Sequence, residues 1–403
     1  MDVIIFRYLG LLVAAMLVAI LARRLRLPYT VGLVIAGAGL AAARVTAGLE
    51  LTHDFIFFAM LPPLLFEAGL AIHWRDLRDD AVPVLTLATL GVVIAALVVA
   101  LGTNALLGWP FASALVFGVL IAATDPVAVI AMFKDTGVKG RLRLLVESES
   151  LLNDGVAAVF FAIVLGLAQA TGDSASLSQA LQALALTAGG GTLVGLLAGG
   201  ICIFIAGRTP DRLVETGLTV IAAYGAFLLG EQLHVSGVLA TVAAGLLMGN
   251  VGVLNARKEN RLALDAPDFV VGFWDFAAFI ANSLIFLLMG VTLAAIPFQS
   301  LGTATLLLIV ALVALGRALS VYPLCLIFAR SRWAIPMRQQ HVLWWGGLRG
   351  ALGLALALAL PPTLAFRNEI VVATFGAVAF SVLVQGLTMA PFLKLLGLLP
   401  ERF

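Results

Sequence analysis

Charged residues are scarce in this sequence: only 11% of its 403 residues are Asp, Glu, Lys or Arg, whereas 62% are hydrophobic. Soluble domains carry about 25% charged residues, so a soluble globular fold is excluded. Cysteine is also rare. Cys202 and Cys325 both fall inside apolar stretches, where we expect them to pack as small hydrophobic side chains. The four histidines are widely separated. The sequence therefore offers no imidazole or thiolate cluster for a transition metal.

What is present in abundance is apolar sequence, arranged in blocks separated by short polar breaks. A helix needs roughly 20 apolar residues to cross a bilayer core about 30 Å thick. We therefore expect an all-α polytopic membrane protein, a single membrane domain over residues 1–403 with thirteen transmembrane helices. The predicted spans are residues 3–22, 27–43, 55–72, 81–101, 110–133, 145–168, 181–206, 213–229, 235–252, 269–294, 301–328, 342–360 and 370–396.

Basic residues predict the orientation of these spans. The loops that follow odd-numbered spans contain seventeen Lys and Arg, and the loops that follow even-numbered spans contain two, Arg44 and Arg367. Lys and Arg are retained on the cytoplasmic side of membranes. We expect the N-terminus outside and the C-terminus in the cytoplasm. The net charge of +2 then reflects membrane topology, and no nucleic acid partner is expected.

An odd number of spans allows an internal repeat in opposite orientations. Residues 1–168 would form one repeat of six helices, 181–206 a linker helix and 213–396 the second repeat. The fifth span contains Thr124-Asp125-Pro126, and the twelfth, its partner at an offset of seven, contains the glycine-rich run 346–350. Pro and Gly both weaken a helix. Interrupted helices in corresponding positions of two repeats indicate a transport site, so we expect them to cross there.

Ionisable residues lie in the middle of four predicted spans, where each costs about 2.5–3.5 kcal/mol even on insertion scales. Asp125, Asp154, Arg317 and Arg349 each lie close to the midpoint of a span, which places them within roughly 5 Å of one plane at 1.5 Å per residue. We expect one cluster. Mutual compensation of two acids and two arginines is the purely structural alternative. Arg349 is expected to offset helix dipole ends and nearby acids in the second interruption.

The sixth span combines carboxylates with other oxygen donors. Glu149 and Asn153 are four residues apart and share one helix face, and Ser150 and Asp154 share the adjacent face. We expect Ser150, Asn153 and Asp154 to face one pocket, where their oxygen atoms would suit a hard cation such as Na+. Glu149 lies nearer the cytoplasm, within reach of Arg317, and this position predicts a structural ion pair between them. Asp154 would then stay free to change partners.

Other small or acidic residues have structural interpretations. Gly191, Gly195 and Gly199 recur at four-residue spacing, which indicates close packing of that helix on a neighbour. Glu215 and Glu231 stand at the ends of predicted helices, where we expect them to be solvated.

Several motifs together resemble the monovalent cation–proton antiporter family, in the branch of bacterial and archaeal Na+/H+ antiporters and animal Na+/H+ exchangers. They are Thr124-Asp125-Pro126, ESLLNDG at 149–155, Arg317, GGLRG at 346–350 and LPPLLFEAGL at 61–70. The resemblance implies thirteen helices in two inverted repeats, a dimerisation domain and a mobile six-helix core that moves like an elevator. It also implies a homodimer and a bacterial or archaeal cytoplasmic (inner) membrane. The long tail of the animal exchangers is missing, so we do not expect regulation by tail-binding partners.

The resemblance also implies residue roles. Asp154 matches the carboxylate that binds the ion and the proton, with Asp125 and the Thr124 carbonyl beside the ion and Ser150 as a further ligand. Asn153 before Asp154 matches the pattern associated with electroneutral exchange. The expected metal ion is transported Na+ or Li+, and no cofactor is expected.

The sequence therefore predicts Na+(Li+)/H+ antiport, in which Na+ and H+ compete for Asp154. A K+/H+ antiporter of the same fold, a Na+-coupled organic-anion carrier and a channel are the alternatives. An enzyme is not expected, because no nucleophile–base pair, metal-ligand spacing or cofactor loop is found. The roles of two further acids stay open. Glu67 either lines a funnel or packs within a helix, and Asp275 lies near a helix end, where its side chain can reach water.

Overall fold

The computed structural model describes residues 2–25, 28–43, 51–169, 177–254, 262 and 264–399. All regular elements within these ranges are helices. Several basic residues that predict the orientation, among them Arg44 and Lys258, lie outside the described residues.

The helices follow one another with short connections. In chain order they are α1 (Asp2–Leu25), α2 (Tyr29–Ala42), the π-helical η1 (Phe55–Met60), α3 (Leu61–Ala71), α4 (Trp74–Asp79), α5 (Ala81–Leu107), α6 (Phe111–Ala122), α7 (Val127–Thr136), α8 (Arg141–Gln169), α9 (Leu177–Ala206), α10 (Arg212–Gln232), α11 (Gly237–Met248), the π-helical η2 (Gly249–Val253), α12 (Pro267–Ala295), the short η3 (Phe298–Ser300), α13 (Thr303–Ile327), α14 (Met337–Trp345), α15 (Ala351–Leu358), α16 (Arg367–Phe380), the π-helical η4 (Ser381–Gln385) and α17 (Gly386–Leu395).

The expected all-α membrane architecture is confirmed. Among the described residues, eight helical segments are long and apolar enough to cross a membrane, and four shorter apolar helices cover Leu9–Ala22, Tyr29–Ala42, Phe55–Ala71 and Gly237–Val253. Two predicted spans are interrupted: residues 123–126 separate α6 from α7 within the span 110–133, and residues 346–350 separate α14 from α15 within the span 342–360. The total of thirteen membrane crossings stays a prediction.

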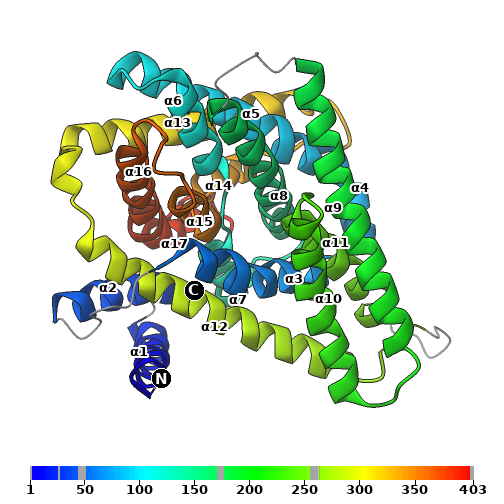
Figure 1. The fold of residues 1–403 in the computed structure, drawn as a ribbon. Helices are drawn as coiled ribbons and strands as arrows, with labels where there is room; N and C mark the ends of the chain where they lie inside the picture. The colour runs from blue at the N-terminus through cyan, green and yellow to red at the C-terminus, as the bar shows by residue number, and fades with distance from the viewer. Residues whose placement is uncertain are drawn as a thin grey trace.

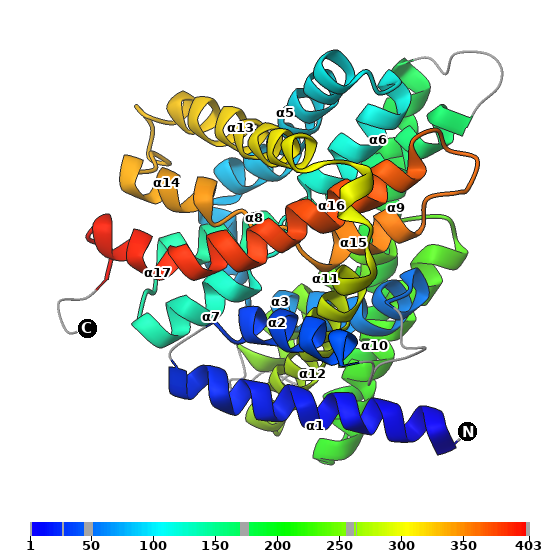
Figure 2. The same cartoon turned by 90° about the vertical axis from the view of Figure 1, so that its left-hand side faces the viewer.

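The helices form two groups, each packed mainly within itself. In the first group, α12 lies along α2, and α11 packs on α3, α9 and α10. In the second group, α5 packs on α6, α8 and α13, and α15 packs on α6 and α16. Figure 1 shows α9 running along one side of the molecule beside α10 and α11. In Figure 2, α1 lies next to α2 at the edge of the first group, and α16 and α17 follow each other through the second.

Some of the helix contacts recur between pairs of helices that are seven predicted spans apart. The contact of α1 with α2 corresponds to the contact of α10 with α11. The contact of α2 with α12 corresponds to the contact of α11 with α3. Likewise, α5 packs on α6 as α13 packs on α14.

The predicted role of the α9 glycines in close packing is confirmed. A Cβ atom added at Gly191 or Gly195 would strike the backbone of Ser236 or Ala240, and one at Gly199 would lie 3.1 Å from the Cα of Ala244. The stripe therefore lets α9 approach α11 closely, as small residues do between membrane helices.

The expected solvation of Glu215 is wrong. Its side chain is fully buried, and its two carboxylate oxygens accept hydrogen bonds from the backbone N–H groups of Asp265, at 2.8 Å, and Ala266, at 3.2 Å. These groups lie just before α12, so Glu215 on α10 satisfies donors at the start of a neighbouring helix. Glu231 is half-buried and accepts from the N–H of Gly237 at 3.0 Å.

Candidate functional site

The first helix interruption lies between α6 and α7, where the sequence placed it. Residue Ala123 leaves the helical conformation, with ψ of 138°, and α7 begins at Val127. Pro126 has no N–H to continue the hydrogen-bond ladder. The Asp125 carboxylate accepts from the Val127 N–H at 2.9 Å, so it caps the first turn of α7.

The second interruption, residues 346–350, crosses the first and is bonded to it. The backbone N–H of Asp125 donates to the carbonyl oxygen of Leu348 at 2.8 Å. The Arg349 guanidinium donates to the carbonyl oxygens of Ala122 and Ala123, at 2.7 and 3.2 Å, at the C-terminal end of α6. Non-helical backbone in a membrane protein persists where protein groups satisfy it. Arg349 therefore contacts the helix end of the first interruption, whereas the sequence placed its role within the second.

The side chains of Glu149 and Arg317 are in contact, as the sequence predicted. Two guanidinium N–H groups of Arg317 donate to the two carboxylate oxygens of Glu149, each at 2.8 Å, and both residues are buried. The same guanidinium donates to the carbonyl oxygen of Leu343 at 3.0 and 3.2 Å. The pair therefore connects α8 with α13 and with α14.

Asn153 does not face the pocket that its spacing predicted. Its amide is buried and fully used: the oxygen accepts from the Thr124 N–H at 3.1 Å, and the nitrogen donates to the Thr124 hydroxyl at 2.6 Å and to Glu149 at 3.1 Å. Asn153 therefore connects the Glu149–Arg317 pair to the first interruption. The two adjacent faces of α8 differ in their surroundings. Glu149 contacts Arg317 of α13 and Asn153 contacts Thr124, whereas Ser150 and Asp154 line the cavity.

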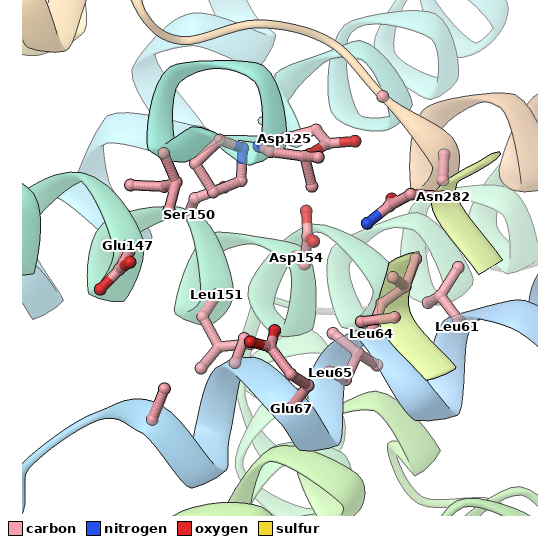
Figure 3. Close-up of a pocket in the computed structure, with 18 of the residues that line it drawn as sticks. Leu61, Leu64, Leu65, Glu67, Asp125, Glu147, Ser150, Leu151, Asp154 and Asn282 are labelled. Carbon is pink, nitrogen blue, oxygen red and sulfur yellow. The ribbon is translucent and has the colours of Figure 1, made fainter. Parts of the chain in front are cut away.

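A cavity of about 510 Å³ lies between the two helix groups and reaches both interruptions. The second group contributes Thr124, Asp125, Ser150 and Asp154 to its wall, and the Ser150 hydroxyl donates to the Thr124 carbonyl oxygen. Figure 3 shows the Asp154 carboxylate projecting into the cavity below Asp125. Within the described ranges, neither aspartate forms an ion pair with Arg or Lys. The purely structural alternative, in which the arginines neutralise both aspartates, is therefore not what the structure shows.

The mouth of the cavity is bordered by the end of α3, the end of η2 and the first turns of α8 and α12. Glu67 and Asp275 line it, together with an Arg143–Glu147 ion pair at 2.8 Å. Of the two interpretations left open for Glu67, the structure supports the funnel. Acids thus outnumber bases along the path to Asp154.

Sequence reasoning missed one residue of this wall, Asn282 on α12. Its side chain is 6% exposed, and it faces Asp154 from the opposite helix group (Figure 3). The available signal was an amide near the middle of the apolar span 269–294. Asn282 carries no charge and stands in no helix interruption, the two features that marked most of the other site residues.

The site can offer a cation two carboxylates and several neutral oxygens. Among the described residues, no three His, Cys, Asp or Glu side chains are grouped as metal ligands. A cation held here would take its remaining ligands from hydroxyl, carbonyl or amide oxygens, which suit a hard ion.

The fold and the site define a polytopic membrane protein whose two interrupted helices cross beside buried acids. The chain belongs to the family described as "Sodium/hydrogen exchanger, transmembrane", whose profile matches residues 11–395. It is 40% identical over 379 residues to the Na+/H+ antiporter ApNhaP of Aphanothece halophytica, covering 94% of this chain and 71% of that protein. It is 37% identical to the Na+/H+ antiporter NhaP of Pseudomonas aeruginosa, covering 83% and 79%.

A solved structure shares the fold. The sodium proton antiporter MjNhaP1 of Methanocaldococcus jannaschii superposes with a TM-score of 0.76 at 22% identity, over 98% of this chain and 99% of that one. The predicted family resemblance is confirmed.

Proposed function

We propose that this protein exchanges Na+ or Li+ for H+ across a membrane, with the two ions competing for Asp154. The observation that carries the proposal is the position of Asp125 and Asp154, which line a cavity between two helix groups while the nearby arginines contact other partners. A protonated or cation-bound Asp154 is neutral or nearly so, whereas the bare carboxylate is costly to bury. A site with a bare Asp154 carboxylate is therefore hindered from moving across the membrane barrier. This couples the flux of Na+ to the flux of H+.

The other residues have separate roles in this proposal. Asp125, the Thr124 carbonyl and Ser150 surround the cation beside Asp154. The Glu149–Arg317 pair and Asn153 are structural: they fix α8 against the first interruption. Arg349 stabilises the end of α6. Asn153 next to Asp154 supports electroneutral exchange.

We further propose two inverted repeats, residues 1–168 and 213–396, joined by a linker helix at 181–206. The recurring helix contacts support this division. The second helix group would move against the first, which would form the interface of a homodimer. With the N-terminus outside a bacterial or archaeal cytoplasmic membrane, the mouth of the cavity faces the cytoplasm, and access to the site alternates. Such exchange would serve sodium and pH homeostasis.

The test is transport by purified protein in proteoliposomes that contain a pH-sensitive dye. Na+, Li+ or K+ is added in turn, with the membrane potential clamped or free. Proton movement driven by Na+ and Li+ and insensitive to voltage would support the proposal. A response to K+ alone would assign the site to K+/H+ exchange, and no response from folded protein would contradict antiport.

A further inference from the structure

Asn282 is placed where it can reach the ion site from the opposite helix group. It lies on α12, in the first group, whereas Asp125 and Asp154 belong to the second. All three residues line the same cavity. Figure 3 shows the Asn282 amide directed across the cavity toward the Asp154 carboxylate.

The Asn282 side chain is not held by other protein groups. The residue is 6% exposed, and its buried Oδ1 atom has no hydrogen-bond partner among the residues that the structure describes. A buried polar atom without a partner costs free energy, and most such atoms in proteins are satisfied. A residue that only supports packing at this place would be better apolar. Because the Asn282 side chain also lines the cavity, its amide points to a partner that enters there.

An amide can satisfy both chemical states of an ion site. Its nitrogen donates, as toward a bare carboxylate, and its oxygen accepts, as toward a cation. The two ends exchange by rotation about the last side-chain torsion, which is soft and roughly two-fold. The second helix group supplies Asp125, Asp154, the Thr124 carbonyl and Ser150, all from one side of the cavity. A neutral oxygen from the other side would complete the coordination of a hard cation.

We propose that Asn282 is a ligand of the transported cation, contributed by the opposite helix group when the cavity is open toward Asp154. This inference rests on the proposed antiport function and extends its ion site. Asn282 thereby sets the affinity for the cation on the side to which the cavity opens. It binds the ion and has no part in holding the proton, which stays on Asp154.

Ser283, the next residue, provides a matched control. Its hydroxyl is likewise buried on α12 and has no hydrogen-bond partner within the described part of the chain, but it does not line the cavity. A general effect of removing a buried polar group from α12 would appear in both variants. An effect on cation binding would appear only at Asn282.

The experiment compares wild type, Asn282→Leu, Asn282→Ala and Ser283→Ala in proteoliposomes. It measures proton movement against external Na+ and Li+ concentration at fixed pH. Side-specific proteolysis first inactivates the molecules of one orientation, so that a single orientation is measured. Leu keeps most of the volume of Asn without the amide, and Ala serves if Leu does not fold. We expect KM for Na+ to rise about tenfold in the Asn282 variants, because each loses one good interaction with a charged group. We expect Vmax within about twofold and an unchanged Ser283→Ala variant, because only the amide contacts the ion.

Unchanged KM in both folded Asn282 variants would overturn the proposal, and so would a lower Vmax at unchanged KM. An equal rise in KM in Ser283→Ala would overturn it as well, since the effect would then come from α12 packing. The failure of the proposed function gives a different result, because wild type itself would then move no protons with Na+ or Li+.

Discussion

Arg317 on α13 donates to both carboxylate oxygens of Glu149 on α8, each at 2.8 Å, and the Asn153 amide joins the same carboxylate at 3.1 Å. Asn153 in turn holds Thr124 in the first helix interruption. A chain of contacts thus runs from α13 to the backbone beside the proposed ion site. In the proposed mechanism the pair stabilises the geometry of the site, although neither Glu149 nor Arg317 lines the cavity.

Removing one partner of this pair should destabilise the protein strongly. Arg317→Met leaves a buried carboxylate without its cation, and we expect a loss of about 3–5 kcal/mol in the free energy of unfolding. Thermal unfolding in detergent measures it. Glu149→Gln combined with Arg317→Met should recover part of the loss.

The half-exposed Arg143–Glu147 pair is the control for this prediction. Arg143→Met should cost no more than about 1 kcal/mol, because exposed ion pairs contribute little. Equal losses at Arg143 and Arg317 would contradict a special role for the buried pair.

Asp154→Asn should abolish exchange while leaving a folded protein. An amide neither releases a proton near neutral pH nor binds Na+ as a carboxylate does. The readout is Na+-dependent proton movement in proteoliposomes, beside size-exclusion chromatography of the same preparation. Asp275→Asn, at the mouth of the cavity, should keep exchange. Saturable Na+-driven proton movement by the Asp154 variant would refute the single-carboxylate mechanism.

Gly350→Ala should impair transport through contact with Asp125. A Cβ atom at Gly350 would overlap the Asp125 carboxylate, which would have to move from its place at the start of α7. We expect Vmax/KM for Na+ to fall at least about tenfold, because the Asp125 carboxylate is displaced from the proposed site. Gly272→Ala on α12 is the control, because its Cβ meets open space. Transport at the wild-type rate by Gly350→Ala would show that the position of Asp125 is not critical.

His53 should help to hold the two helix groups together at the end of the molecule opposite the cavity mouth. Its ring Nδ1 is 2.9 Å from the Ala355 carbonyl oxygen, and it must be the donor because a carbonyl only accepts. This bond joins the start of η1 in the first group to α15 in the second. His53→Ala should therefore speed hydrogen exchange of the α15 amides.

The exposed His73 before α4 gives the control for this effect. His73→Ala should leave exchange in α15 unchanged. If His53→Ala also leaves it unchanged, the His53 contact does not contribute to closing this end.

Both helix interruptions could be predicted because their cause is local. Pro126 and the glycines of 346–350 weaken a helix wherever they stand, and the arginine and aspartate beside them mark the middle of the membrane. The contact between Glu149 and Arg317 was also predictable, since few partners exist for a charge at that depth. The packing of α9 followed from glycine spacing alone.

What the sequence could not give depends on how helices face one another. Helical periodicity placed Asn153 and Asp154 on adjacent faces of α8, but only tertiary packing decides which face meets the cavity. Glu215 was expected in water because it lies near a helix end, and the start of α12 covers it instead. Asn282 carries no charge, so nothing local distinguished it from a residue of the packed interior.

The capping of α6 by Arg349 has an electrical consequence for the proposed exchange. Arg349 and Asp125 are bonded into the crossing, and in the proposed one-for-one exchange only Asp154 changes between Na+ and H+. One positive charge replaces another at a single carboxylate, and the net charge of the moving helices is equal in the two loaded forms. A membrane voltage performs about 2.3 kcal/mol of work on each elementary charge per 100 mV. Over a full one-for-one cycle this work cancels, so the concentration gradients of the two ions alone set the direction of exchange.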